Sequence, residues 1–281
     1  MQKLALPRGC CRGVTSLSAV RVQGQNAWNC VLHRSPSIFP YQDKFTFKEK
    51  ETDSASVLKM LDPFVSPERQ ASIAKVAAER TFSVVPVIEG IHNSGNIAAV
   101  LRSADAMGYG AVHCIHKSDQ KYKKSQRSSA GADKWLDVCV WDDTRECLTQ
   151  FKDRGFNIVA THMTKASIDM HDVDWTKPTA VVLGNEGEGI SDTTVELSDA
   201  CAIIPMVGFV ESFNISVAAA VTLYEARRSR IEKLGWHGDL SAEEQQILRA
   251  VMFLRNKTEA SDYVAELLNR NPSNLSVPVD L

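Results

Sequence analysis

Apolar and β-branched residues gather in short runs along the middle of the chain, and segments with helical spacing separate most of these runs. Such runs are typical of strands that are buried on both faces, and the helical segments between them indicate βα units. The predicted strands cover residues 84–88, 111–115, 136–140, 156–160, 180–183 and 201–204. The alternation therefore predicts an α/β fold, in which a parallel sheet carries helices on both faces.

Helices are predicted within this region and at both of its ends. Residues 66–80 open with serine and proline and place Glu68 in the first turn, which is a helix start signal. The longest candidate has Val217, Val221 and Tyr224 on one side and gathers arginines near its C-terminal end, where the helix dipole favours them. The helices expected after residue 80 cover residues 97–107, 144–154, 214–234 and 241–269.

Length and composition restrict the class of protein. A chain of 281 residues with 44% hydrophobic content can bury a large core, which favours one main domain with extensions. No apolar run approaches the roughly 20 residues of a bilayer-spanning helix, so we expect no membrane association. The seven cysteines are scattered without a C-x-x-C pair, which argues against a zinc or redox site.

The charge distribution separates the N-terminal segment from the rest. Residues 1–42 contain five basic residues and no acid, which leaves a formal charge of −7 for the remainder of a chain whose total is −2. A basic, serine-containing and acid-free leader is typical of a mitochondrial or plastid transit peptide, although a basic arm that stays attached has the same composition. We expect a transit peptide or disordered segment over 1–42, a linker over 43–65 and a C-terminal helical extension over 236–281.

Three loops that follow predicted strands are chemically unusual. They are residues 89–108 (EGIHNSGNIAAVLRSADAMG), 184–191 (GNEGEGIS) and 205–216 (PMVGFVESFNIS). Ligands of open α/β sheets bind outside the carboxyl ends of the strands, so these loops are the first candidates for a site. Each loop alone has a structural explanation, since glycines permit turns and asparagines cap helices. Their occurrence at three strand ends favours a functional site.

These loops resemble the motifs of the SpoU family of RNA methyltransferases, and most closely its TrmH branch. The first loop carries the asparagine–arginine pair as Asn96 and Arg102, and the second resembles G-x-E-x-x-G with Gly184 and Gly189 at its ends. The third resembles I-P-M-x-G-x-x-x-S-L-N-V-S-x-A, with Phe213 and Ile215 in place of the leucine and valine. The similarity covers residues 66–235, which we therefore expect to form the methyltransferase domain.

The resemblance implies a SPOUT fold with a C-terminal trefoil knot, S-adenosyl-L-methionine (AdoMet) as methyl donor without a metal, and a homodimer. Contacts to AdoMet are then expected from Thr161, Gly184, Glu186, Ile204, Met206 and Phe213. The same resemblance assigns catalysis to Arg102, Asn96, Glu186, Ser212 and Asn214, with Arg102 facing the substrate ribose.

The sequence offers no obvious base for the ribose 2'-hydroxyl proton. His92 lies near the first motif, but it could equally be a loop histidine that has no role in the reaction. The family proposal makes Arg102 the base, but a guanidinium holds its proton throughout the physiological pH range. The same side chain could instead fork onto a phosphate and stabilise the developing alkoxide. Both interpretations make Arg102 essential.

An RNA substrate requires local basic patches, because phosphates supply most of the attraction. Two charge runs qualify, residues 117–127 and 227–233, although a solvated face is the usual fate of such a run. We expect RNA contacts from Arg69, Arg80, Lys121, Lys123, Lys124, Arg127, Arg228 and Arg230.

The resemblance to the TrmH branch thus implies an AdoMet-dependent tRNA 2'-O-ribose methyltransferase of the D-loop guanosine at position eighteen, and the N-terminal composition predicts its location in a mitochondrion or chloroplast. Methylation of rRNA is the nearest alternative, because the motif loops are shared. A non-catalytic RNA-binding protein would be expected to lack some of the motif residues, and all of them are present. A nicotinamide-dependent dehydrogenase is disfavoured because no G-x-G-x-x-G follows the first strand.

Overall fold

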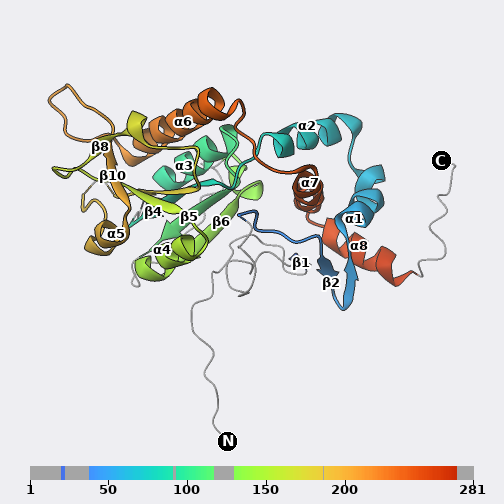
Figure 1. Cartoon of the computed structure of the whole chain (residues 1–281). Coiled ribbons are helices and arrows are strands. Elements are labelled where there is room, and N and C mark those ends of the chain that lie inside the picture. The colour runs from blue at the N-terminus through green and yellow to red at the C-terminus, as the bar shows by residue number, and fades with distance from the viewer. Residues whose placement is uncertain (1–19, 23–37, 91–92, 117–129, 186, 271–281) are drawn as a thin grey trace, which may run out of the picture. The chain divides into compact units, whose positions relative to one another are not determined.

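The computed structural model describes residues 20–22, 38–90, 93–116, 130–185 and 187–270, which divide into two compact units (Figure 1). The first unit is formed by Glu79–Asp239 together with residues 38–40. The second unit combines Tyr41–Ala78 with residues 20–22 and 240–270, so it is built from two parts of the chain that are distant in sequence.

A parallel sheet forms the centre of the first unit, and its described strands have the order β6-β5-β4-β9-β7-β10-β8. Their bounds are β4 (Val84–Glu89), β5 (Ala111–Ile115), β6 (Asp137–Trp141), β7 (Asn157–Thr161), β8 (Ile168–Asp169), β9 (Thr179–Leu183) and β10 (Ala200–Ile203). The six predicted strands are confirmed to within one or two residues. The sequence missed β8, because its two residues are both exposed and form no apolar run.

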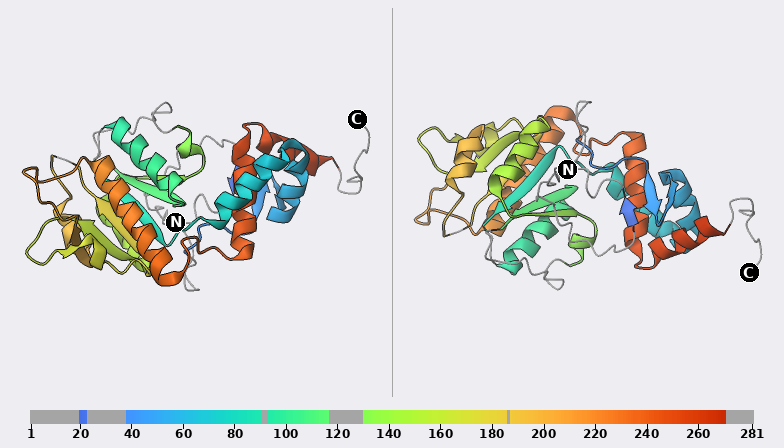
Figure 2. Two further views of the ribbon diagram at one scale, coloured as in Figure 1. Left: turned by 90° about the horizontal axis from the view of Figure 1, so that it is seen from above. Right: turned by 90° about the horizontal axis from the view of Figure 1, so that it is seen from below.

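Helices cover both faces of this sheet, as predicted. In Figure 2, the view from above shows α3 (Ser94–Ala106) beside α6 (Ile215–Leu234), and these two helices contact one another. The view from below shows α4 (Thr144–Asp153) and α5 (Asp192–Leu197) on the other face. Helix α3 begins three residues earlier than predicted, because the Asn93 side chain caps it by accepting from the Gly95 and Asn96 amides.

The strand order explains where a ligand can bind. Strands β4, β5 and β6 follow one another toward one edge of the sheet. Strand β9, which comes later in the sequence, pairs with β4 on one side and with β7 on the other. The direction of strand succession therefore reverses at the boundary between β4 and β9. Loops that leave the carboxyl ends of two such strands diverge, which opens a crevice for ligands.

Two arginines expected to contact RNA are buried inside the first unit. Arg80 is 1% exposed and pairs with Asp105, and Arg230 is 2% exposed. The Arg230 guanidinium donates to Asp239 Oδ2 at 2.9 Å and to the Trp175 carbonyl oxygen at 3.1 Å. The expectation that Arg80 and Arg230 bind RNA is wrong, because neither guanidinium can reach a phosphate outside the protein.

Removal of the Arg230 side chain should therefore affect folding. We expect Arg230→Ala to lower the free energy of unfolding by about 3 kcal/mol, since Asp239 and the Trp175 carbonyl lose a buried charged donor. Chemical denaturation measures this effect, with Lys233→Ala in the exposed last turn of α6 as the control. Equal stability of the two variants would contradict a structural role for Arg230.

The second unit contains four described helices and a small antiparallel sheet. The helices are α1 (Ser54–Leu61), α2 (Pro67–Ala78), α7 (Ala242–Asn256) and α8 (Ala260–Asn269), with a short 3-10 turn, η2 (Asp62–Phe64), after α1. The strands β1 (Val20–Val22), β2 (Phe45–Phe47) and β3 (Lys50–Thr52) pair in that order. Helix α7 contacts α1, α2 and α8.

Two expectations about this unit are corrected. Residues 43–65, expected to be a linker, contain β2, β3 and α1, and the side chains of Phe45 and Phe47 are almost fully buried. The predicted helix over 241–269 is divided between α7 and α8, because Lys257 adopts an extended backbone that ends α7.

The segment expected to precede the folded protein also takes part in it. Val20–Val22 forms β1 and pairs with β2. The ring of Phe39, which is 6% exposed, packs edge-on against Phe82 at 5.5 Å between centroids. The Tyr41 hydroxyl accepts a hydrogen bond from Arg255 at 3.1 Å. The folded part therefore begins before residue 43, at Ile38 or earlier.

Candidate functional site

A cavity of about 720 Å³ opens at the carboxyl ends of β7, β9 and β10 in the first unit. Its walls come from the residues after each of these strands and from the first turn of α6. The described residues predicted to contact AdoMet all line it: Thr161, Gly184, Ile204, Met206 and Phe213. Ser212 lines it as well. The cavity falls within the size range of pockets that hold small ligands and cofactors.

The second loop closes tightly on itself beside this cavity. The backbones of Asn185 and Gly189 exchange two hydrogen bonds, 3.2 and 3.0 Å long. A Cβ atom on Gly184 would lie 2.3 Å from the carbonyl carbon of Gly189, so glycine is required there by the neighbouring backbone. Gly189 has a φ of +70°, a conformation that glycine adopts without strain. Glu186, which follows Asn185 in the sequence, lies outside the described residues.

Asn185 joins the first and second loops and was not among the predicted site residues. Its Nδ2 donates to the Gly90 carbonyl oxygen at 2.9 Å, and its Oδ1 accepts from the amides of Gly187 and Glu188 at 2.7 Å. The local signal was available, since an asparagine two residues before a glycine is typical of a side chain that closes a turn. This contact fixes the start of the first loop against the cavity wall.

Glu89 provides a second connection between the loops and was also missed. This carboxylate at the end of β4 is 6% exposed and accepts hydrogen bonds from the hydroxyls of Thr144, Ser191 and Thr194 at 2.6–2.8 Å. The Ser191 amide adds a fourth bond at 3.0 Å. A buried carboxylate requires such donors, so an acid that ends an apolar strand is itself a signal of a polar cluster.

The asparagines of the first and third loops come together, as their predicted shared site requires. Asn214 caps α6 by accepting from the Ser216 amide at 2.9 Å, and its Nδ2 lies 3.4 Å from Asn96 Oδ1. Arg102 is exposed on α3, and no hydrogen bond or ion pair joins it to another described residue. It does not line the cavity, so its guanidinium is not part of the cavity wall.

The remaining residues predicted to bind RNA have different surroundings. Arg228 is about half exposed, but its guanidinium pairs with Glu225 at 2.7 Å and with Glu232 at 2.6 Å. These contacts raise the pKa of Arg228, chiefly through hydrogen bonds from its guanidinium to Glu225. Arg69 is exposed on α2. Lys121, Lys123, Lys124 and Arg127 lie outside the described residues, as does His92.

Neither a metal-binding cluster nor a membrane-spanning helix occurs in the part of the chain that the structure describes. No group of three or more histidine, cysteine, aspartate or glutamate side chains there is arranged to hold a metal ion. Nor does any described helix combine the length and apolar character needed to cross a membrane.

Residues 83–224 match the family model described as the SpoU rRNA Methylase family, and this segment contains the three loops and most of the cavity. The chain belongs to this family. A tRNA (guanosine(18)-2'-O)-methyltransferase of Aquifex aeolicus is 35% identical over 188 residues, which is 67% of this chain and 89% of that protein. A protein of the same name from Escherichia coli is 34% identical over 59% of this chain and 72% of its own length.

The family assignment agrees with the fold. The crystal structure of the A. aeolicus TrmH/SpoU tRNA modifying enzyme superposes with a TM-score of 0.61 and 36% sequence identity. The superposition covers 66% of this chain and 95% of that one. The resemblance of the motif loops is thus confirmed by the family match and by the overall structure.

Proposed function

We propose that this chain is an AdoMet-dependent tRNA 2'-O-ribose methyltransferase that modifies the D-loop guanosine at position eighteen. The observation that carries the proposal is the convergence of the motif loops: five predicted AdoMet contacts line one cavity, and Asn96 meets Asn214 beside it. The names of the relatives from A. aeolicus and E. coli supply the tRNA and the nucleotide.

The residues of the cavity fit AdoMet. Leu183, Ile204 and Phe213 offer apolar surface for an adenine ring, and the backbone between Ile204 and Met206 offers polar groups to its edge. When bound, AdoMet supplies an electrophilic methyl group on a sulfonium. The chain must then hold a ribose 2'-hydroxyl in line with that methyl group and remove its proton.

Arg102 is the side chain best suited to position the ribose. It is exposed, and its planar guanidinium can bridge a phosphate and the developing alkoxide without losing a proton. Asn96 and Asn214 hold the start of α3 against the start of α6. Because Arg102 lies on α3, this contact fixes its position relative to the cavity.

The experiment that tests the proposal is mass spectrometry of ribose-methylated nucleosides in tRNA and rRNA from cells that lack the protein. Loss of 2'-O-methylguanosine at position eighteen of tRNA would support it, and purified protein should restore the modification in vitro. Loss of a methyl group from rRNA alone would favour the rRNA alternative, which the family description also names.

We further propose that the C-terminal part of the first unit is tied in a trefoil knot. The support is the strand order together with the family resemblance. Strand β9 lies between β4 and β7, both of which precede it in sequence, and β10 then pairs with the opposite edge of β7. This order is the one expected of a chain that passes back through its own earlier segments, which supports the knot.

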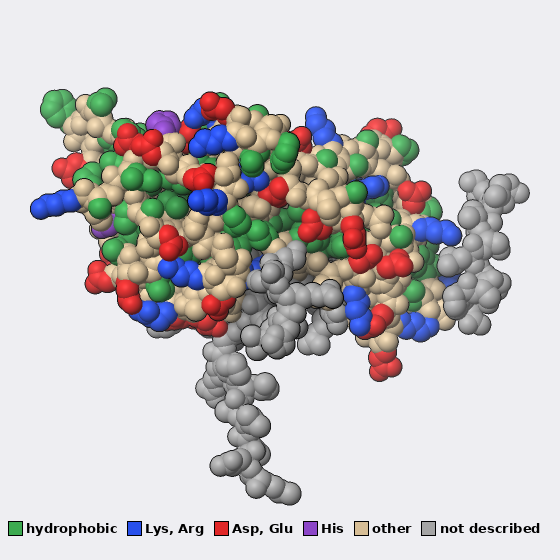
Figure 3. All heavy atoms as spheres, in the orientation of Figure 1, with side chains coloured by type: hydrophobic (Ala, Val, Ile, Leu, Met, Phe, Trp, Pro, Cys, Tyr) green, Lys and Arg blue, Asp and Glu red, His purple; other side chains and the backbone are tan. Residues whose placement is uncertain are grey.

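We propose that two copies of the chain associate through α6. Val217, Val221 and Tyr224 follow one another at helical spacing and are 45%, 39% and 60% exposed. The loop between β10 and α6, at the upper left of Figure 3, adds Val207 and Phe209, which are fully exposed. Exposed apolar surface of this kind is typical of an interface.

A charge in this surface should separate the two copies. We expect Val221→Asp to shift the protein from dimer to monomer in sedimentation experiments, because burial of an unpaired carboxylate in the interface is unfavourable. Val76→Asp is the matched control, since Val76 is also a helical valine and is 40% exposed, but lies in the second unit. A wild-type protein that sediments as a monomer would exclude the dimer.

For RNA binding we propose the exposed side chain of Arg69 and, from the charge runs, Arg228 and the segment 117–127 with Lys121, Lys123, Lys124 and Arg127. The support is their charge, because the basic residues of an otherwise acidic chain are the ones that attract RNA phosphates. Arg228 already pairs with two glutamates, so it would have to exchange these partners for a phosphate.

We propose that the basic N-terminal segment directs the protein to a mitochondrion or chloroplast. The support is its composition, with five basic residues and no acid in residues 1–42. A fusion of this segment to a fluorescent reporter should enter an organelle, and a reporter that stays in the cytosol would contradict the proposal.

The packing of residues 38–42 sets the limit of any truncation. A chain that starts at Ile38 lacks β1 but keeps Phe39 and Tyr41, and it should still methylate tRNA. A chain that starts at Gln42 should be at least about 2 kcal/mol less stable than the chain from Ile38, because it also lacks buried Phe39 and Tyr41. Thermal melting and single-turnover methylation of the two truncated proteins measure the difference. Equal stability would mean that the two aromatic rings contribute nothing.

A further inference from the structure

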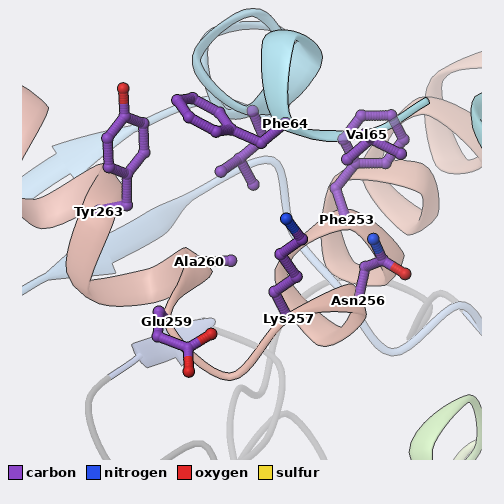
Figure 4. A pocket seen from close by; sticks show the side chains of 9 residues that line it. Phe64, Val65, Phe253, Asn256, Lys257, Glu259, Ala260 and Tyr263 are labelled. Atoms are coloured by element: carbon purple, nitrogen blue, oxygen red, sulfur yellow. The ribbon is translucent and has the colours of Figure 1, made fainter. Parts of the chain in front are cut away.

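The second unit contains a pocket of about 240 Å³ that the methylation site does not use (Figure 4). It lies where η2 and the end of α1 meet the junction between α7 and α8. Its walls are almost entirely apolar and are formed by Leu61, Phe64, Val65, Phe253, Ala260 and Tyr263. Most of this pocket lies outside the segment that matches the family model, residues 83–224.

Two aromatic rings form one side of the pocket. Phe64 and Tyr263 meet edge to face, with their ring centroids 4.3 Å apart. Phe64 is 42% exposed even though the apolar wall of the pocket adjoins it, so a large part of its ring is open to a ligand. Flat aromatic surface beside an apolar cavity suits another ring system, which can stack on it.

Cations lie at the rim of the same pocket. Lys257 is exposed, and Figure 4 shows its ammonium directed toward Phe64, whereas the carboxylate of Glu259 points away. Arg69 of α2 donates from Nε to Asn256 Oδ1 at 3.2 Å, and Asn256 itself lines the pocket. The pocket therefore combines an apolar, aromatic interior with two positive charges at its mouth.

We propose that this pocket receives an unpaired base of the RNA substrate, with the adjacent phosphates on Lys257 and Arg69. Proteins recognise single-stranded RNA by stacking bases on aromatic side chains and neutralising the backbone with lysine and arginine. An apolar side chain of a protein partner would fill the interior equally well but would not use the two cations. The inference rests on the proposed RNA substrate and adds a contact distant in sequence from the motif loops.

The test compares substitutions of Phe64 in the full chain, with tRNA transcript as the probe. Phe64→Leu keeps an apolar side chain and removes the ring, whereas Phe64→Tyr keeps the ring. We expect Phe64→Leu to weaken tRNA binding and raise KM for tRNA about tenfold, as loss of one stacked base does, and Phe64→Tyr to bind nearly as wild type. The turnover number at saturating tRNA and the Kd for AdoMet should remain unchanged, and Val76→Leu serves as the control.

Salt dependence provides an independent readout. Lys257→Gln should reduce the slope of log Kd against log salt concentration by about 0.7, the contribution of one contact to a single-stranded phosphate. Unchanged tRNA affinity in both Phe64→Leu and Lys257→Gln would overturn the inference, even if the wild-type protein methylates tRNA. Weaker binding in Phe64→Tyr as well as Phe64→Leu would also count against stacking. A wild-type protein that neither binds nor methylates tRNA would instead overturn the proposed function.

Discussion

Arg102→Lys should lower turnover on tRNA by roughly 100-fold or more, a loss of about 3 kcal/mol in transition-state stabilisation. Lysine keeps the charge and the aliphatic stem but cannot make the planar two-point contact of a guanidinium. Arg102→Ala should show a loss of similar size. Because Arg102 is exposed and is joined to no other described residue, both variants should melt at the wild-type temperature and bind AdoMet normally.

A matched substitution separates this effect from a general sensitivity to arginine loss. Arg145→Lys changes an exposed arginine of α4 that pairs with Glu196, and its turnover should remain within about twofold of wild type, as is usual for exposed ion pairs. Single-turnover methylation under saturating AdoMet gives the comparison. A near-normal rate for Arg102→Lys would exclude both the forked contact and the role of base.

Gly184→Ala should abolish measurable AdoMet binding. A single added methyl group would stand 2.3 Å from the Gly189 carbonyl carbon and 2.5 Å from the Ile190 amide nitrogen, so the loop must open. The residues after β9 form one wall of the cavity, and their displacement removes main-chain groups that the ligand requires. Isothermal titration calorimetry measures the loss.

Gly187→Ala in the same loop is the control. Among the described residues, a Cβ at that position meets only the Asn185 side chain, at 3.5 Å, which is an ordinary contact. We expect AdoMet affinity within about twofold of wild type, since an exposed loop position tolerates a methyl group. If Gly184→Ala also binds normally, the cofactor lies elsewhere than in this cavity.

The parallel sheet was predictable because its strands are buried on both faces and therefore form continuous apolar runs. Strands β2 and β3 have only three residues each, and the two residues of β8 are exposed, so none of them produces a pattern. The second unit was hidden for another reason. It joins segments that lie about 160 residues apart, and local periodicity carries no information about which distant segments pack together.

The burial of Arg230 could not be decided from the spacing of residues along α6. Arg230 follows Leu223 and Ala226 at spacings of three and four residues, and all three lie on the buried side of α6. Val217, Val221 and Tyr224 have the same spacing on the exposed side. The helical spacing of apolar residues thus defines two faces of α6, and only the tertiary structure decides which of them packs against the core.

The lining of the candidate cofactor cavity was predictable from the motif loops, whereas the residues that hold these loops together were not. Asn185 and Glu89 act through contacts with Gly90 and Ser191, which lie 95 and 102 residues away in sequence. A sequence motif records residues that lie close together along the chain. Contacts that align one loop with another require the strand order, which placed β9 beside β4.

The discontinuous second unit has a consequence for synthesis on the ribosome. Helices α1 and α2 emerge early, but α7, against which they pack, follows only after the whole of Glu79–Asp239. At a translation rate of about 5–20 residues per second, their apolar side chains wait on the order of ten seconds or more for a partner. Nascent chains arrested before residue 242 should accordingly present Val57 and Ile73 to chaperones, and completed chains should not.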